Sequence, residues 1–202
     1  MEKFTNIAKS NSVVPEHKLK FLWDSVCECP PGDIVEVGCW RGGTSLILSA
    51  SARESKPESR VYLCDTFKGI VLAGPNDNTH KDGDFSNTSK QHVQDLLTKQ
   101  GLTNFTLLEG TFPHDTGHLV ETKTISLLHI DVDVYEGYLA ILRWAQPYLV
   151  DGAIIVFDDY SAPTCLGATK AVDEYFTERA DFEMHLWPDE TRSSWTKYRA
   201  IS

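Results

Sequence analysis

Two pairs of aspartates follow apolar runs in this sequence. The run in LLHIDVDVYEG ends at Asp131 and Asp133, and the run in AIIVFDDY ends at Asp158 and Asp159. A buried ionised carboxylate costs several kcal/mol unless it is paired or holds a metal ion. The residue types and their spacing therefore indicate either a set of paired acids or a metal site.

The elements that position these acids are short apolar strands alternating with helical segments. Strands that are apolar on both faces are typical of a parallel sheet covered by helices. We expect strands over 33–38, 60–65, 105–110, 125–131 and 152–159, helices over 43–54, 89–101, 136–149 and 166–179, and a terminal strand pair over 182–188 and 195–202. This order predicts an α/β fold with a doubly wound, mostly parallel seven-stranded sheet that ends in an antiparallel hairpin.

A glycine-rich segment, VEVGCWRGGTS, joins the first predicted strand to the first helix. Its glycines allow a tight turn and a close approach to a ligand, and the helix N-terminus behind them offers unpaired N–H groups. Trp40 breaks the dinucleotide fingerprint, and no Gly-Lys-Ser/Thr phosphate loop is present. A simple strand-to-helix turn is the alternative reading.

Two further acids belong to the same region. Asp65 ends the second predicted strand, about 20 residues beyond the glycines, where a carboxylate accepts both hydroxyls of a ribose. Glu36 lies inside the first strand. It could face the amino end of a bound ligand, or reach solvent as an ordinary strand acid.

The motifs E-x-G-x-x-x-G-G-T, LCDTFKG, HIDVDVYE and FDDY together resemble the macrocin O-methyltransferase family. Its members are class I, Rossmann-like enzymes that use S-adenosylmethionine to methylate sugar hydroxyls of antibiotics. The resemblance extends from about residue 35 to 176, and GATKAVDEYF also matches. The glycine segment is shared by all class I methyltransferases, whereas the three acidic motifs are more specific to this family.

The resemblance implies the ligands and their residues. S-adenosylmethionine would contact residues of the glycine segment and the end of the second strand: Glu36, Gly38, Gly42, Gly43, Thr44, Ser45, Asp65 and Thr66. A divalent cation, Mg²⁺ in most members, would bind Asp131, Asp158 and Asp159. The general base would be Asp131 or a group close to it.

The chemistry of the acids agrees with that implication. In such a sheet the fourth and fifth strands are neighbours about 4.8 Å apart, so Asp131 and the Asp158–Asp159 pair converge. Their mutual repulsion would raise their pKa values, and a hard cation such as Mg²⁺ would relieve it. The cation could hold two vicinal hydroxyls of a sugar or catechol and lower the pKa of the attacking hydroxyl.

Two neighbours of Asp131 have competing interpretations. His129 should share a strand face with Asp131, which makes it a second candidate base, although a satisfied core histidine is the alternative. Asp133 lies beyond the strand end, where we expect it to cap the next helix or to serve another structural role.

Two irregular regions flank the predicted site. The loop over 69–89 is expected to shape the acceptor site or to fold over the cofactor. Its candidate contacts are His80, Lys81, Asp82 and Asp84, unless the loop is merely solvated. About 30 residues precede the first strand, and the stretch PEHKLKFLWDSVCE among them reads as one helix, whereas larger family members carry an N-terminal region that closes over the acceptor.

The composition of the chain disfavours some classes of binding partner and indicates a cellular compartment. The 202 residues carry 29 acidic and 19 basic side chains, a net charge of −10, which disfavours nucleic acid and anionic membranes as partners. Five cysteines without zinc-ligand spacing indicate reduced thiols in a cytoplasmic protein. The sequence shows no signal peptide and no membrane span. We expect one domain over 1–202, with 1–32 as an N-terminal helical segment, and the sequence is compatible with a homo-oligomer.

The leading functional hypothesis is a metal-dependent O-methyltransferase acting on a small hydroxylated acceptor, a sugar or glycosylated natural product. An N-methyltransferase acting on an amino sugar would need little change to the scaffold. A nicotinamide-dependent dehydrogenase is disfavoured by the glycine spacing. A non-catalytic cofactor-binding module is the remaining alternative, and the clustered carboxylates argue against it.

Overall fold

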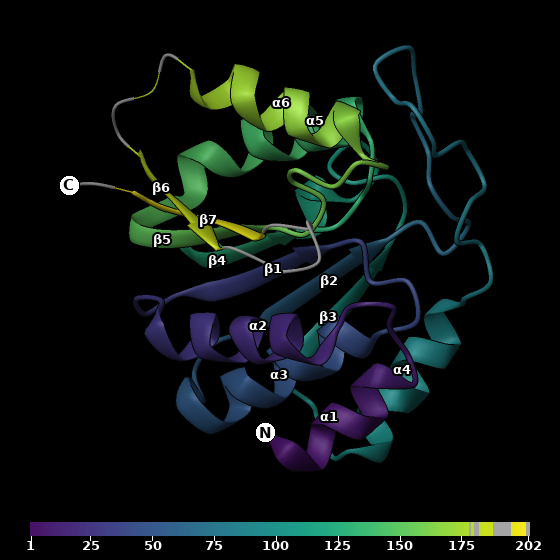
Figure 1. The fold of residues 1–202 in the computed structure, drawn as a ribbon. Coiled ribbons are helices and arrows are strands. Elements are labelled where there is room, and N and C mark those ends of the chain that lie inside the picture. Colours follow the sequence, from purple (N-terminus) through teal and green to yellow (C-terminus); the bar gives the residue numbers. More distant parts are fainter. Residues whose placement is uncertain (178, 180–181, 188–194, 201–202) are drawn as a thin grey trace.

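The computed structural model describes residues 1–177, 179, 182–187 and 195–200. One seven-stranded sheet crosses these residues in the order β3-β2-β1-β4-β5-β7-β6 (Figure 1). Its strands are β1 (Asp33–Val37), β2 (Val61–Asp65), β3 (Phe105–Glu109), β4 (Ile125–Ile130), β5 (Leu149–Phe157), β6 (Phe182–Trp187) and β7 (Trp195–Ala200). Strands β1 to β5 are parallel, and β7 pairs antiparallel with β5 and β6. The predicted fold class is confirmed.

Helices cover both faces of the sheet. They are α1 (Glu2–Lys9), α2 (Glu16–Glu28), α3 (Gly43–Ser55), α4 (Lys90–Lys99), α5 (Tyr135–Ala145) and α6 (Leu166–Phe176), with short 3₁₀ turns η1 (Gly117–Leu119) and η2 (Gln146–Tyr148). Figure 1 shows α1 to α4 on one face and α5 and α6 on the other. Strand residues alternate between the two cores, because Ile34 packs with the first group and Val35 with the second. No helix among these described elements is long and apolar enough to cross a bilayer.

The boundaries differ from the prediction in a few places. The helix predicted over PEHKLKFLWDSVCE is confirmed as α2, but the residues before it form a further helix, α1, whose Phe4 and Ala8 lie one helical turn apart and are both buried in the core with α2 and α3. Helix α5 ends at Ala145, just before Pro147, which lacks the N–H that a continuing helix needs. Residue 178 of the predicted last helix, and residues 188, 201 and 202 of the predicted strand pair, lie outside the described residues.

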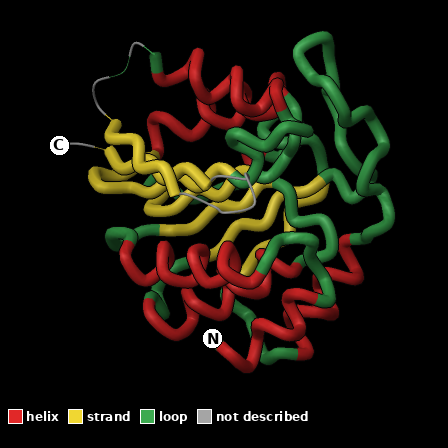
Figure 2. The backbone as a smooth tube through the Cα atoms, in the orientation of Figure 1, coloured by secondary structure: helices red, strands yellow, loops and turns green. Residues whose placement is uncertain are grey.

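A long loop over 66–89 joins β2 to α4 and stands beside α5 and α6 (Figure 2). Its base is closed by backbone hydrogen bonds, since Ile70 N–H donates to the carbonyl of Asp84 at 2.8 Å and Gly83 N–H donates to that of Ile70 at 2.9 Å. The loop is therefore an ordered part of the structure and can carry residues of a site.

Polar side chains attach the tip of this loop to the first turns of two helices. Asp77 accepts hydrogen bonds from the N–H groups of Gly74 at 2.8 Å and Tyr135 at 2.9 Å. Asn78 accepts one from Leu166 N–H at 3.1 Å. The first turn of a helix leaves N–H groups without intrahelical partners, so the loop supplies the acceptors that α5 and α6 lack.

One glycine brings the glycine segment against the acid cluster. Gly38, directly after β1, has φ +96°, and a Cβ atom there would lie 1.7 Å from the carbonyl oxygen of Asp131. Only glycine tolerates both the backbone conformation and this close approach. The contact fixes the separation between the two segments that were predicted to form the site.

We expect Gly38→Ala to lower the free energy of unfolding by about 2–5 kcal/mol, because it adds both a strained φ and a backbone clash. The matched control is Gly101→Ala, where φ is +72° but no atom lies within 4 Å of the added Cβ. That control should cost only about 1–2 kcal/mol. Urea denaturation measures both values, and equal losses would show that the contact with Asp131 is unimportant.

We expect Asp77→Ala to release the loop from α5. Hydrogen exchange at the amides of Gly74 and Tyr135 should accelerate roughly five- to tenfold for the loss of about 1 kcal/mol per hydrogen bond. Asp82→Ala is the control, because Asp82 accepts its hydrogen bond from Ala73 N–H within the same loop. Unchanged exchange at Tyr135 in Asp77→Ala would contradict the attachment.

Candidate active site

A cavity of about 370 Å³ opens at the carboxyl ends of the parallel strands. The segments that follow β1, β2, β3, β4 and β5 all contribute to its wall, together with the 66–89 loop and the connection between α1 and α2. Wall residues used below are Lys18, Gly38, Asp65, Thr66, His80, Asp131, Asp133, Asp158, Asp159 and Cys165. The position agrees with the rule that ligands of doubly wound sheets bind at the strand carboxyl ends.

Asp65 holds the glycine segment in place. Its Oδ2 accepts the N–H groups of Cys39 at 2.7 Å and Trp40 at 2.8 Å, and its Oδ1 accepts that of Phe67 at 2.6 Å. Burial raises the pKa of Asp65, although these hydrogen bonds oppose the shift. Oδ2 uses both of its lone pairs in these bonds, whereas Oδ1 accepts only one N–H and has a second lone pair that can still accept a ligand hydroxyl.

The predicted cofactor residues divide into two groups. Gly38, Asp65 and Thr66 are part of the cavity wall. The others are not part of that wall: Glu36, Gly42, Gly43, Thr44 and Ser45. The amide of Gly43, in the first turn of α3, donates to the carbonyl of Asn11 at 3.1 Å, so the connection between α1 and α2 covers this turn. Local sequence patterns did not predict this cover, because it depends on contacts between distant segments.

Glu36 and His129 form a buried pair across β1 and β4. The two residues are neighbours in the sheet register, and His129 Nδ1 lies 3.0 Å from Glu36 Oε1. Ser45 donates to the other carboxylate oxygen of Glu36. Glu36 is fully buried, so the interpretation as a solvent-reaching strand acid is wrong. With Nδ1 bound to Glu36, Nε2 is the nitrogen of His129 that can face a cation, as in carboxylate–histidine–metal arrangements.

Asp131, Asp158 and His129 form a potential cation site. One donor atom from each lies within 4.8 Å of the others. Strand pairing brings the two aspartates together, since Asp158 N–H donates to Ile130 and Asp131 N–H donates to Val37. The sequence prediction that these acids converge is confirmed.

The electrostatics of the pair favour a cation. Burial and the nearby carboxylates, Asp158 first among them, raise the pKa of Asp131 well above its ordinary value. Burial raises the pKa of Asp158 to about 6, against the opposing effect of Lys18. Asp158 Oδ1 is buried and accepts no hydrogen bond from the residues that the structure describes, and the ammonium nitrogen of Lys18 lies 3.9 Å away. A buried acceptor of this kind, beside a second carboxylate and an imidazole, fits a divalent cation.

Lys18 is a site residue that the sequence analysis missed. It lies in α2 with a relative exposure of 4%, on the same side as the buried Leu22, one turn later. A lysine on the apolar face of an amphipathic helix was the available signal. The lysine partly neutralises Asp158, at a separation longer than a hydrogen bond.

The carboxylate of Asp159 accepts hydrogen bonds from Tyr138 and Asp133. Its Oδ2 accepts hydrogen bonds from the Tyr138 hydroxyl at 2.8 Å and from Asp133 N–H at 2.9 Å. It lines the cavity but is not in the group that His129, Asp131 and Asp158 form. Its observed contacts brace the turn between β4 and α5, and its role as a third metal ligand stays a prediction.

The prediction that Asp133 caps the following helix is wrong. Helix α5 has Val134 as its N-cap without a side-chain hydrogen bond, and Asp77 from the distant loop supplies the acceptor for Tyr135 N–H. Asp133 adopts φ +65°, a strained conformation for a residue other than glycine. It lines the cavity, and burial together with Asp159 raises its pKa to about 8.

The 66–89 loop contributes to the cavity in part. His80 is on the wall, and its Nδ1 lies 3.8 Å from Asp84 Oδ2. Lys81 and Asp82 are exposed and lie off the wall. The loop is therefore more than a solvated connection, although only one of its four candidate residues faces the cavity directly.

Comparison with known proteins identifies relatives. A family model described as Macrocin-O-methyltransferase (TylF) matches residues 17–193. Demethyldecarbamoylnovobiocin O-methyltransferase of Streptomyces niveus is 30% identical over 168 residues, which cover 76% of this chain and 60% of the relative. The 8-demethyl-8-(2,3-dimethoxy-alpha-L-rhamnosyl)-tetracenomycin-C 4'-O-methyltransferase of Streptomyces olivaceus is 28% identical over 148 residues, 68% of this chain and 56% of that protein. The chain thus spans between 56% and 60% of the length of these curated relatives.

A solved structure of another protein has a fold similar to that of this chain. The O-methyltransferase NovP superimposes with a TM-score of 0.80 at 24% identity, covering 95% of this chain and 83% of NovP. At that identity the likeness concerns the fold alone. The sequence matches carry the family assignment, because the family model covers most of the chain and the S. niveus relative covers three quarters of it. The chain therefore belongs to the macrocin O-methyltransferase family.

Proposed function

We propose that this protein transfers a methyl group from S-adenosylmethionine to a hydroxyl of a small acceptor, a sugar or a glycosylated natural product. The observation that carries the proposal is one cavity with Asp65 on its wall and the Asp131–Asp158 pair on the same wall. Family membership supports it, and so do the names of the two curated relatives, which are O-methyltransferases of a rhamnosyl-tetracenomycin and of demethyldecarbamoylnovobiocin.

The methyl donor would occupy the part of the cavity next to the glycine segment. Asp65 and Thr66, which both line the cavity, would accept hydrogen bonds from the ribose hydroxyls of S-adenosylmethionine. When bound, the donor supplies an electrophilic methyl group. The protein's contribution is to hold the acceptor oxygen in line with that group and to exclude water. The wall offers apolar side chains for this purpose, including Val14, Ile70, Leu72, Phe85, Phe112 and Ile141.

A divalent cation, Mg²⁺ or another, would be held by Asp131 and Asp158, with Asp159 or His129 completing its ligands. The two carboxylates are ligands that suit Mg²⁺, and an imidazole ligand would also allow Mn²⁺ to bind. When bound, the cation would lower the pKa of the acceptor hydroxyl. Glu36 would orient the imidazole through the 3.0 Å contact with His129 Nδ1, and Tyr138 would keep Asp159 in place.

The hydroxyl proton needs an acceptor on the cavity wall. We propose Asp131 or His129 in this role, as the sequence suggests. Asp133 is a third candidate on the same wall, because a carboxylate whose pKa is raised to about 8 is a stronger base than an ordinary one.

We also propose a domain organisation and a cellular location for the chain. Residues 1–202 would act as one domain, with residues 1–32 covering the first turn of α3 and one side of the cavity. Contacts from Asn11 and Lys18 support that role. The net charge of −10 disfavours nucleic acid and anionic membranes as partners, and the five cysteines without zinc-ligand spacing support a cytoplasmic location.

Isothermal titration tests the methyl-donor site. We expect S-adenosylhomocysteine to bind with a dissociation constant on the order of micromolar, and NAD not to bind. Asp65→Ala should weaken binding by about tenfold or more, since it removes the ribose acceptor. Asp33→Ala is the control, because Asp33 also accepts a backbone N–H, from Arg60, but lies at the opposite end of β1. Binding of NAD without S-adenosylhomocysteine would overturn the proposal in favour of a dehydrogenase.

A methyl-transfer screen tests the cation. With Mg²⁺ and S-adenosylmethionine present, transfer to sugars, catechols or amino sugars identifies the acceptor class. We expect EDTA to abolish transfer and Asp158→Asn to reduce it by about 10–100-fold or more, because the cation loses a ligand. Asp151→Asn, an exposed acid near the start of β5, should leave the rate unchanged. Full activity in excess EDTA would rule out the metal role, and methylation of amines alone would favour an N-methyltransferase.

A further inference from the structure

A buried lysine lies on the cavity wall, and the proposed methyl transfer gives it no role. Lys18 belongs to α2 and has a relative exposure of 4%. Among the described residues that line the cavity, it is the only lysine or arginine, whereas the same wall carries the carboxylates of Asp65, Asp131, Asp133, Asp158 and Asp159. A buried ammonium group is stable only beside negative charge, so its position depends on the acids nearby.

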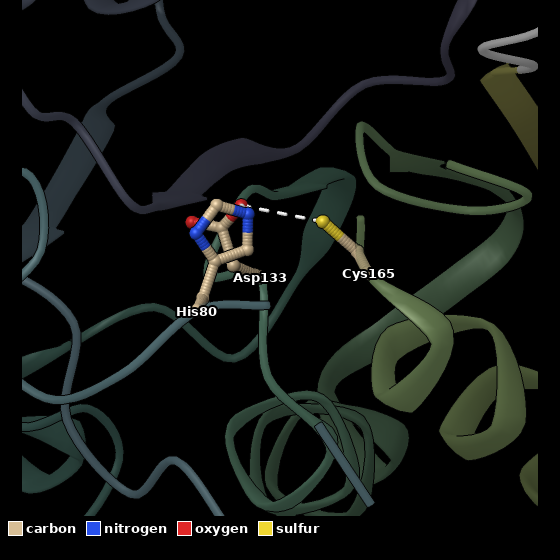
Figure 3. A group of neighbouring side chains, drawn as sticks. All are labelled: His80, Asp133 and Cys165. Atoms are coloured by element: carbon tan, nitrogen blue, oxygen red, sulfur yellow. Dashed lines mark hydrogen bonds and ion pairs between the residues drawn. The ribbon is translucent and has the colours of Figure 1, made fainter. Parts of the chain in front are cut away.

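Asp133 has neighbours of its own on this wall. Its Oδ1 lies 3.5 Å from both His80 Nε2 and Cys165 Sγ. Figure 3 shows these three side chains pointing toward one another from separate segments of the chain. The surroundings of this carboxylate therefore come from the 66–89 loop and the start of α6, whereas Lys18 comes from α2.

Asp158 is the acid that Lys18 approaches. Lys18 Nζ lies 3.9 Å from Asp158 Oδ1, an oxygen that accepts no hydrogen bond from the described part of the chain. The same carboxylate belongs to the potential cation site with Asp131 and His129. A single carboxylate thus serves two positive charges, the ammonium of Lys18 and the proposed cation.

Helix α2 limits how far the ammonium can move. Leu19 and Leu22, which flank Lys18 on the helix, are fully buried in the core with α3. The stem of the lysine is enclosed with them, so the ammonium cannot turn out to solvent as that of a surface lysine does.

The short distance implies strong repulsion between the two positive charges. A cation bonded to Asp158 Oδ1 at about 2.1 Å would lie at most about 6 Å from Lys18 Nζ. At that separation, a divalent ion and an ammonium repel each other enough to change a binding constant by about tenfold, even with the dielectric constant of water.

We propose that Lys18 and the divalent cation compete for Asp158, so that Lys18 determines how tightly the cation binds. The inference rests on the cation of the proposed function and adds the residue that sets its affinity. Lys18 is a positioning residue, because it acts through Asp158. In the absence of the cation the ammonium stabilises the acid cluster, and in its presence the ammonium weakens the complex and keeps the ion exchangeable.

Cation affinity tests the competition without methyl donor or acceptor. Mn²⁺ binding to the metal-free chain is measured by electron paramagnetic resonance of the free ion at about pH 8, where protons compete little for ordinary carboxylates. We expect Lys18→Met to lower the dissociation constant by about tenfold or more, because it removes the repulsion. Lys18→Arg keeps the charge and should stay within about threefold of the wild type.

Lys20→Met is the matched control. Lys20 lies in the same helix, but it is exposed and pairs with Asp24, so its loss should leave the affinity for Mn²⁺ unchanged. Circular dichroism checks that each variant is folded. Lys18→Gln, which keeps a polar side chain, takes the place of Lys18→Met if the apolar variant does not fold.

Thermal unfolding measures the same competition independently. In EDTA we expect Lys18→Met to melt at a lower temperature than the wild type, because the buried carboxylates lose their compensating charge. An equal excess of Mn²⁺ should then raise the melting temperature of Lys18→Met by about 2–4 °C more than that of the wild type, since tighter binding stabilises the folded chain further.

The possible outcomes separate this inference from the proposed function. If the wild type binds Mn²⁺ and Lys18→Met binds it equally or more weakly, the inference is overturned and the proposed function stands. An affinity that rises as much in Lys18→Arg as in Lys18→Met would also overturn it, because charge would then not be the cause. If neither the wild type nor Lys18→Met binds Mn²⁺, the inference fails together with the cation role in the proposed function.

Discussion

Repulsion between carboxylates at the ends of β4 and β5 constrains the rest of this site. The parallel register places Ile130 beside Phe157, so Asp131 and Asp158 leave the sheet next to each other. Burial and mutual repulsion raise the pKa of both carboxyls. Positive charge must lie nearby if both are to stay ionised, and Lys18 at 3.9 Å from Asp158 supplies only part of it. A divalent cation would supply the remainder and orient an acceptor.

The neighbouring residues keep the acids where a cation needs them. Glu36 Oε1 forms a hydrogen bond with His129 Nδ1, and the Tyr138 hydroxyl donates a hydrogen bond to Asp159 Oδ2, so both side chains are held in position. Gly38 allows the backbone of Asp131 to approach the glycine segment, which brings the methyl-donor region and the acid cluster into one cavity. The same interactions would position both proposed ligands in one cavity, which supports the proposal of methyl transfer over that of a module that only binds a cofactor.

The sequence predicted the sheet, its order of elements and the meeting of Asp131 with Asp158, because strand periodicity and the α/β arrangement determine these features. It failed where distant segments supply the partner. Asp133 resembled a helix cap, but Asp77, 58 residues before Tyr135 in the chain, accepts the hydrogen bond from Tyr135 N–H. Lys18 and the cover over α3 depend on how the N-terminal helices pack, which local patterns do not encode.

The central claim is that the clustered acids bind a divalent cation. The most direct test is a crystal of the protein soaked with Mn²⁺ and measured for anomalous scattering. The account predicts a peak between the carboxylates of Asp131 and Asp158, within bonding distance of both. The absence of a peak there, with the ammonium of Lys18 moved into hydrogen-bonding contact with Asp158 instead, would contradict it.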